Sequence, residues 1–223
     1  MVEFAAFTGL RASELAGLEV ADLSFAPTSV GAPAKCSVRV DRTKIRKEGT
    51  WTTGTPKSKR SRRTVPLPGW LAHRMADYLA DVHPRAAEPT APLWPSRRNG
   101  GGYRAKGARY AVPLDWSSPL HMDAFHATVF KPALAAVGLP VTAPARDGEA
   151  ATQGVRLHDL RHSAAVAWLQ AGVPVVQVSR WLGHAQPTIT LNVYGDWVPE
   201  TVESPLPEPL ARRVVVPLRG HVP

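Results

Sequence analysis

The chain has 223 residues, 44% of them hydrophobic and 20% charged, which is enough for one well-packed soluble domain and too little for two large ones. Its 27 Lys and Arg outnumber its 18 Asp and Glu, and the net charge of +9 favours a polyanionic partner, nucleic acid first, although a coding bias toward arginine would give the same balance. The composition excludes an internal disulfide, because Cys36 is the single cysteine, and the chain shows neither the roughly 18-residue apolar run of a membrane helix nor a secretion signal.

The N-terminal part predicts a helix, a break and a second short helix. Val2 to Phe7 is mostly apolar, and Thr8 and Gly9 then interrupt the run. A helical spacing resumes with Leu15 and Leu18.

Residues Lys35 to Pro68 are predicted to form a small antiparallel sheet. Apolar and polar residues alternate from Ser37 to Asp41, Thr50 to Thr53 is rich in β-prone residues, and Arg62 to Leu67 closes the set. Helical periodicity returns from Trp70 to Val82, which we interpret as a core helix.

Prolines and three consecutive glycines predict a long loop between Pro84 and Pro119. This stretch also holds a basic cluster that includes Arg97 and Arg98, so it fits either a solvated insertion or a loop that contacts nucleic acid. Phe125 to Val137 predicts a further helix, and Val141 to Gly154 predicts another loop.

Two consecutive helices are predicted toward the C-terminus, from His158 to Ala171 and from Val175 to Leu182. Each is followed by a glycine, a residue that favours a helix end. Beyond Val198 the chain is rich in proline. These elements indicate a mainly α-helical domain with a small antiparallel β-sheet, an α+β fold.

Four segments, in this order, resemble the tyrosine recombinase (phage integrase) family. They are Thr8 to Leu15, Pro56 to Pro66, His158 to Arg161, and Leu182 to His184 followed by Tyr194. Each motif is short enough to occur by chance, but the ordered set spans nearly the whole chain. The resemblance implies the catalytic-domain fold of that family and active-site roles for six residues: Arg11, Lys57, His158, Arg161, His184 and the nucleophile Tyr194.

The chemistry of phosphodiester cleavage asks for the same residue types. A scissile phosphate gains negative charge as a nucleophile adds, so the site must present fixed cations. Arg11 and Arg161 are assigned this role, because a guanidinium stays charged and each charge-assisted hydrogen bond contributes about 1.5–3 kcal/mol. Arg11 also lies three residues before Glu14, so a surface salt bridge is the alternative. The resemblance makes Glu14 a residue that supports the site.

His158 and Arg161 lie three positions apart, so on a helix they project from one face toward the same phosphate. Forming the phenolate of Tyr194 at neutral pH costs about 4 kcal/mol, because a free tyrosine has a pKa of about 10. The surrounding cations lower that cost, and His158 is the expected proton acceptor. For His184 the resemblance implies a hydrogen bond to the phosphate or packing against it, with a purely structural histidine as the alternative.

The leaving 5′ oxygen needs a proton, which a lysine on a β-hairpin can supply as general acid. The resemblance implies Lys57 for this role, in the turn before the predicted strand Arg62 to Leu67, and Lys59 is the reserve. The neighbouring basic residues and two from the long loop are expected to contact the DNA backbone: Lys59, Arg60, Arg62, Arg63, Arg97 and Arg98.

No metal or other cofactor is expected. His158 and His162 lie four apart, as in zinc-binding helices, but Asp159 stands where that motif needs glutamate. His162 is therefore interpreted as a capping or buried histidine. The resemblance implies that arginines supply the charge, and that rejoining needs no nucleotide because the phosphotyrosine ester conserves the bond energy.

The resemblance implies a site-specific recombinase that cuts and rejoins DNA through a 3′-phosphotyrosine and a Holliday junction. Residues 1–200 are expected to form the catalytic domain, without the upstream core-binding domain of the family, and residues 201–223 a tail that is flexible or docks on a neighbouring protomer. The implied partners are double-stranded DNA, further copies in a homotetramer, and accessory DNA-bending or directionality proteins, in the cytoplasm on the nucleoid. The alternatives are a type IB topoisomerase and a DNA-binding fragment without catalytic activity.

Overall fold

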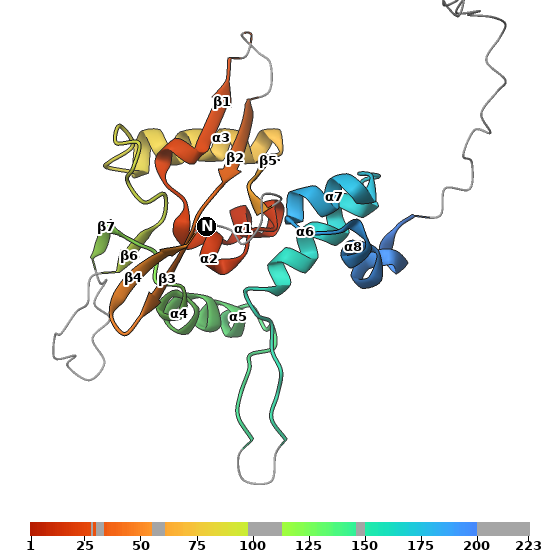
Figure 1. Cartoon of the computed structure of the whole chain (residues 1–223). Helices are drawn as coiled ribbons and strands as arrows, with labels where there is room; N and C mark the ends of the chain where they lie inside the picture. Colours follow the sequence, from red (N-terminus) through yellow and green to blue (C-terminus); the bar gives the residue numbers. More distant parts are fainter. Residues whose placement is uncertain (28, 30–33, 55–60, 98–112, 146–149, 200–223) are drawn as a thin grey trace, which may run out of the picture.

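The computed structural model describes residues 1–27, 29, 34–54, 61–97, 113–145 and 150–199. Figure 1 shows a sheet crossed by one helix at one side of the molecule, three C-terminal helices at the other, and the N-terminal helices between them. The helices are α1 (Val2–Thr8), α2 (Ala12–Gly17), α3 (Gly69–Asp77), α4 (Met122–Phe125), α5 (Lys131–Ala136), α6 (Asp159–Gln170), α7 (Val175–Leu182) and α8 (Pro187–Tyr194). The strands are β1 (Leu23–Ala26), β2 (Lys35–Val40), β3 (Thr43–Lys47), β4 (Thr50–Gly54), β5 (Arg63–Pro66), β6 (Pro95–Arg97) and β7 (Leu114–Pro119).

The main sheet has three antiparallel strands in the order β1-β2-β5. Val38 of the central strand pairs with Leu23 on one side and with Val65 on the other, and all three side chains are buried. Helix α3 packs against β2 and contributes Leu71 and Met75 to the same core. The predicted alternation is confirmed, because successive side chains of a strand point to opposite faces of the sheet.

Two hairpins complete the β structure, one formed by β3 and β4 and the other by β6 and β7. The second hairpin corrects the expectation of one long loop from Pro84 to Pro119, and residues 98–112 within that stretch lie outside the described part of the chain. Pro95 and Pro119 pair at one end of this ladder, beside a register shift. A proline is tolerated at a strand end because no interior ladder bond needs its missing N–H.

The predicted helices are confirmed with small shifts of their ends. The helix expected from Trp70 to Val82 is α3 continued by a π-helical turn. The helix expected from Phe125 to Val137 begins earlier, at the first residue of α4, and reaches α5 through a second π-helical turn. Residues 187–194, for which the pattern predicts no element, form α8. Within the described ranges, no helix combines the length and apolar character that crossing a bilayer requires.

Two clusters of buried side chains hold the fold together. The larger one joins the sheet, α1 and α3, with Phe4 and Leu71 among its members. The smaller one joins α6, α7 and α8 around Leu169 and Leu182. Helix α1 packs along α6, and Trp168 contacts both clusters. The C-terminal helices are thereby tied to the rest of the domain.

Two glycines with left-handed backbone conformation end helices at this junction. Gly9 follows α1 with a φ of 60°, and Gly183 follows α7 with a φ of 70°. A Cβ on Gly9 would lie 3.1 Å from the Leu182 side chain, and one on Gly183 would lie 2.9 Å from Nη1 of Arg63. Both the backbone angle and the close approach therefore require glycine at these positions.

Truncation of the smaller cluster is expected to destabilise the fold. Leu169→Ala removes a fully buried side chain from the contact of α6 with α7 and α8, and the free energy of unfolding should fall by about 2–5 kcal/mol. Leu139→Ala, at an exposed position, is the control and should change it by about 0.5 kcal/mol or less. Urea unfolding followed by circular dichroism measures both, and equal losses would contradict this description of the core.

Candidate active site

Arg161 of α6 lies at the junction of the two clusters, and only 3% of it is exposed. Its Nη1 donates a hydrogen bond to the Gly9 carbonyl and its Nη2 to the Leu182 carbonyl, both at 2.6 Å. These carbonyls stand at the C-terminal ends of α1 and α7, where the helix dipole attracts a cation. Burial, together with repulsion from Arg11 and Arg63, lowers the pKa of Arg161 to about 9, so the guanidinium remains charged at neutral pH.

A buried carboxylate, Glu14 of α2, organises the neighbouring cations. Arg63 donates to it from both Nη atoms, each at 2.8 Å, and Arg11 donates from Nη1 at 3.2 Å and from its backbone N–H at 2.7 Å. Burial alone would raise the pKa of Glu14, but the hydrogen bond and charge of Arg63, followed by those of Arg11, outweigh it and lower the pKa. The salt bridge considered for Arg11 is present, and 40% of the Arg11 side chain stays exposed.

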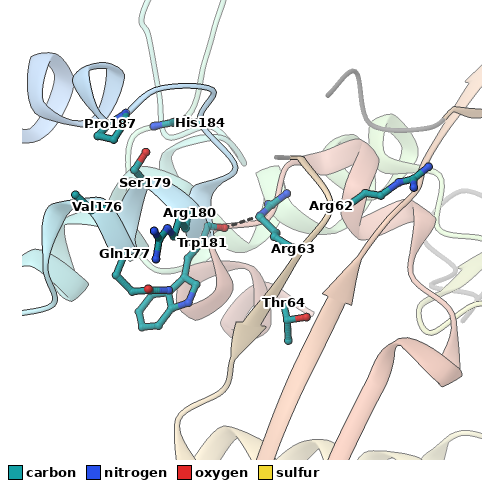
Figure 2. A pocket seen from close by; sticks show the side chains of 10 residues that line it. All are labelled: Arg62, Arg63, Thr64, Val176, Gln177, Ser179, Arg180, Trp181, His184 and Pro187. Carbon is teal, nitrogen blue, oxygen red and sulfur yellow. Dashed lines mark hydrogen bonds between the residues drawn. The ribbon is translucent and has the colours of Figure 1, made fainter. Parts of the chain in front are cut away.

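Arg63 does not match its expected role as a DNA contact. Its side chain is 4% exposed, because it binds Glu14 and also donates from Nε to the Trp181 carbonyl at 2.5 Å. Figure 2 shows this side chain reaching from β5 toward α7, whereas that of Arg62 points away from α7. Successive side chains of an extended chain face opposite sides, and here Arg63 faces the interior while Arg62 faces solvent. We therefore correct the expectation for Arg63, which joins α2, β5 and α7.

Two histidines flank Arg161. His158 precedes α6 and is exposed, and partial desolvation together with the charges of His162 and Arg161 lowers its pKa. His184 follows α7, where burial and the repulsion of Arg161 and the other guanidiniums lower its pKa to about 4. The ring of His184 is therefore neutral at pH 7, and its Nδ1 lies 2.8 Å from Oγ1 of the buried Thr190.

Tyr194 ends α8 and is 4% exposed. Its hydroxyl oxygen lies 2.8 Å from Nδ1 of His162, whereas His158 was expected as the proton acceptor. Burial raises the pKa of Tyr194, and the charge of Arg161 partly offsets that rise. The interpretation of His162 as a capping or buried histidine needs correction, because its ring is partly exposed and in contact with the phenol.

The structure brings five of the six expected active-site residues into one region. Arg11 and Arg161 act electrostatically on both His158 and His184, and Arg161 acts on Tyr194 as well. Among the residues that the structure describes, no three His, Cys, Asp or Glu side chains are grouped to hold a metal ion. The positive charge of this region comes from guanidinium groups.

Some of the expected residues cannot be placed. Lys57, the sixth active-site residue, lies outside the described part of the chain, as do three of the expected DNA contacts: Lys59, Arg60 and Arg98. Arg62 and Arg97 are described, and both are exposed.

An open pocket of about 540 Å³ adjoins the site between β5, α7 and the start of α8 (Figure 2). Arg62, Gln177, Arg180 and His184 are among the residues that line it. The sequence motifs do not include Arg180, which is exposed on α7. A cationic pocket thus opens beside the region in which the active-site residues meet.

Two further residues of the site, His162 and Thr190, were not among the expected active-site residues. His162 follows His158 by one helical turn, so laying out α6 places both on one face. Thr190 belongs to α8, and no pattern predicts that helix.

A family model described as the Phage integrase family matches residues 1–199 of the chain. A "Tyrosine recombinase XerC-like" protein of Caldanaerobacter subterraneus subsp. tengcongensis is 27% identical over 202 residues, covering 86% of this chain and 44% of the relative. The chain thus spans about half the length of the relatives it matches.

Solved structures with the same fold include the Tn1549 transposon integrase in complex with circular intermediate DNA. It has a TM-score of 0.53 at 17% identity, over 86% of this chain and 53% of that one. A variant of that integrase in complex with transposon right end DNA has the same TM-score and identity, over 86% and 52% of the two chains. The likeness confirms the predicted fold class.

Removing the charge of Glu14 is expected to destabilise the protein. Glu14→Gln leaves the Arg63 guanidinium buried without its carboxylate, and loss of one partner of a buried pair costs about 3–5 kcal/mol. Glu88→Gln is the matched control, because Glu88 is exposed and pairs with Arg85 at the surface, where a pair contributes about 1 kcal/mol or less. Urea unfolding at pH 7 measures both, and similar losses would contradict the role assigned to Glu14.

The direction of the Glu14 pKa shift also sets the sign of a pH effect. The pKa is lower in the folded than in the unfolded chain, so the stabilisation is present above the ordinary glutamate pKa of about 4.3 and is lost as the pH falls through the folded value. The stability of the wild type should therefore decline more steeply below about pH 4 than that of Glu14→Gln. Parallel declines would speak against this linkage.

Proposed function

The chain belongs to the phage integrase family, and from this premise we propose that it is a site-specific recombinase that cleaves and rejoins DNA through a 3′-phosphotyrosine at Tyr194. The observation that carries the proposal is the surroundings of this tyrosine. Its side chain interacts electrostatically with the charge of Arg161, and the same charge acts on His158 and His184. A phenol placed among fixed cations and imidazoles suits attack on a phosphodiester.

Two arginines supply the positive charge in this proposal. Arg11 keeps part of its side chain exposed while Glu14 holds it in place, so it is oriented before a phosphate arrives. Arg161 is buried and already donates to two carbonyls, so it acts mainly through its fixed charge. The exposed His158 and the neutral His184 complete the set as hydrogen-bond donors to the phosphate oxygens.

In the cleavage step, the phenol oxygen of Tyr194 forms a bond to phosphorus while the bond from phosphorus to the 5′ oxygen breaks. Tyr194 is 4% exposed in this structure, so the groups that cover its hydroxyl must give way to the phosphate when DNA binds. We assign protonation of the leaving 5′ oxygen to Lys57, with Lys59 as the alternative. Rejoining reverses these bond changes, so no nucleotide is consumed.

Double-stranded DNA is the partner that the charges favour. Arg62 and Arg180 are exposed at the pocket beside the site, Arg97 is exposed on β6, and the whole chain carries a net charge of +9. Exposed arginines of this kind neutralise backbone phosphates and fix the position of the duplex. The solved complexes of the Tn1549 integrase with DNA support the same partner.

Strand exchange between two sites asks for more than one copy of the enzyme. We extend the proposal to a homotetramer on paired sites, with residues 1–200 as the catalytic domain and residues 201–223, outside the described part, as the tail that docks on a neighbouring protomer. Accessory DNA-bending or directionality proteins would act on this assembly.

The nucleophile is tested with Tyr194→Phe. This variant should form no denaturation-resistant adduct with a nicked suicide duplex, because it lacks the attacking oxygen, while its noncovalent affinity for DNA stays nearly unchanged. Denaturing gels detect the adduct, and mobility shifts measure the affinity. An adduct formed by the variant would refute the assignment. Relaxation of plasmid without any strand exchange by the wild type would instead favour a type IB topoisomerase.

The DNA-binding surface is tested by salt dependence. Arg62→Ala and Arg180→Ala should each weaken binding at all sequences and reduce the slope of log affinity against log salt by about 0.9, the share of one phosphate contact. Arg74→Ala is the control, because Arg74 lies on α3 and pairs with Glu3. Equal slopes for all four proteins would exclude the pocket as a DNA contact.

A further inference from the structure

His162 lies between the expected nucleophile and a second histidine of the site. Its Nδ1 is 2.8 Å from the hydroxyl oxygen of Tyr194. Its ring centroid lies 5.6 Å from that of Tyr194 and 5.0 Å from that of His158. The imidazole in contact with the phenol is therefore that of His162.

The geometry of α6 explains why His162, rather than His158, meets the phenol. The two histidines are four residues apart, so their rings lie one turn apart on the same face. His158 stands at the exposed start of the helix, whereas His162 lies one turn further along. The turn that follows α8, Gly195–Trp197, packs against α6. Arg161, next to His162 in sequence, directs its guanidinium to the ends of α1 and α7 instead.

We propose that His162 is a catalytic residue, the general base that takes the hydroxyl proton of Tyr194 as the phenol oxygen attacks the scissile phosphate. The inference rests on the proposed recombinase function. A general base must stand within about 2.6–3.2 Å of the group it deprotonates, and His162 does. His158 is then left to donate a hydrogen bond to the phosphate.

The proton and the bonds balance in this step. In the neutral ring with its proton on Nε2, the lone pair of Nδ1 accepts the hydroxyl proton. The bond from Oη to hydrogen breaks as the bond from Oη to phosphorus forms, and His162 becomes an imidazolium. The bond from phosphorus to the 5′ oxygen breaks, and that oxygen receives a proton from a separate acid, assigned to Lys57. In rejoining, the imidazolium returns its proton to the departing tyrosine oxygen.

Several titratable groups surround His162. His158 and Asp159 of α6 interact with it electrostatically, Tyr194 contacts it from α8, and Asp196 stands in the turn that packs against α6. The active base is the neutral imidazole. A general base accepts a proton only in its neutral form, so a variant whose side chain cannot take a proton should lack the acidic limb of the pH–rate profile.

The experiment is single-turnover cleavage of a nicked suicide duplex, chosen by footprinting, by the wild type, His162→Asn, His162→Gln and His158→Asn. The rate is measured from about pH 5 to about pH 9, the range in which an imidazole base titrates. Asparagine places an amide atom near the position of Nδ1, so it can keep the hydrogen bond to the phenol but takes no proton. His162→Asn should be about 100-fold slower or more and lose the acidic limb, whereas His158→Asn should be slower and keep it. DNA affinity and thermal unfolding show whether each variant is folded.

A duplex with sulfur in place of the leaving 5′ oxygen separates the two proton transfers. A thiolate departs without a proton, because a thiol is far more acidic than an alcohol. The substitution should therefore leave the defect of His162→Asn in place. If the sulfur-containing duplex restores the rate of His162→Asn, the variant is defective in protonating the leaving group, and the inference is overturned.

The inference is also overturned if both His162 variants cleave at the wild-type rate and keep the acidic limb. Faster cleavage by these variants would overturn it too, because it would mean that His162 only holds the hydroxyl of Tyr194 in place. If His158→Asn is the one variant that loses the acidic limb of the pH–rate profile, His158 takes the hydroxyl proton of Tyr194. These outcomes differ from failure of the proposed function, in which the wild type forms no adduct with any duplex.

Discussion

The buried guanidinium of Arg161 is the constraint on which the rest of the structure depends. Its two hydrogen bonds join the end of a helix at the start of the chain to the end of a helix near residue 182. Without it, both carbonyls would lose a charged donor, and an unsatisfied buried acceptor costs about 1–3 kcal/mol. The same charge reaches His184 and Tyr194. The side chain that connects the two parts of the fold therefore also sets the electrostatics of the site.

The charge balance around Glu14 shows how such a cluster stays both buried and cationic. Three guanidiniums, those of Arg11, Arg63 and Arg161, stand against one carboxylate, so two positive charges remain. Arg63 takes the bidentate position and Arg11 the more exposed one. The carboxylate of Glu14 thus interacts most strongly with the structural cation Arg63. The region keeps an excess positive charge, which a phosphate would neutralise.

Much of the fold was predictable, because periodicity reports which side chains are buried, whereas the expected site residues came from the resemblance of four motifs to a known family. The alternation around Val38 and the helical spacing from residue 158 onward are examples of such periodicity. The remainder depends on tertiary contacts. The segment that forms α8 is rich in β-branched residues, which have low intrinsic helix propensity, so packing against α7 stabilises it rather than local preference. The contact of His162 with Tyr194 could not be foreseen without that helix, and the inward position of Arg63 depends on which face of β5 meets Glu14.

The close contact of Gly183 with Arg63 limits which substitutions this part of the structure can accept. The space a Cβ would need at this position is occupied by Arg63, whose guanidinium is itself held by Glu14. Substitutions at these three positions therefore share one packing unit, and their energetic effects are not additive. Glu14, Arg63 and Gly183 therefore constrain one another's substitutions, and a change at one of them is expected to need compensating changes at the others.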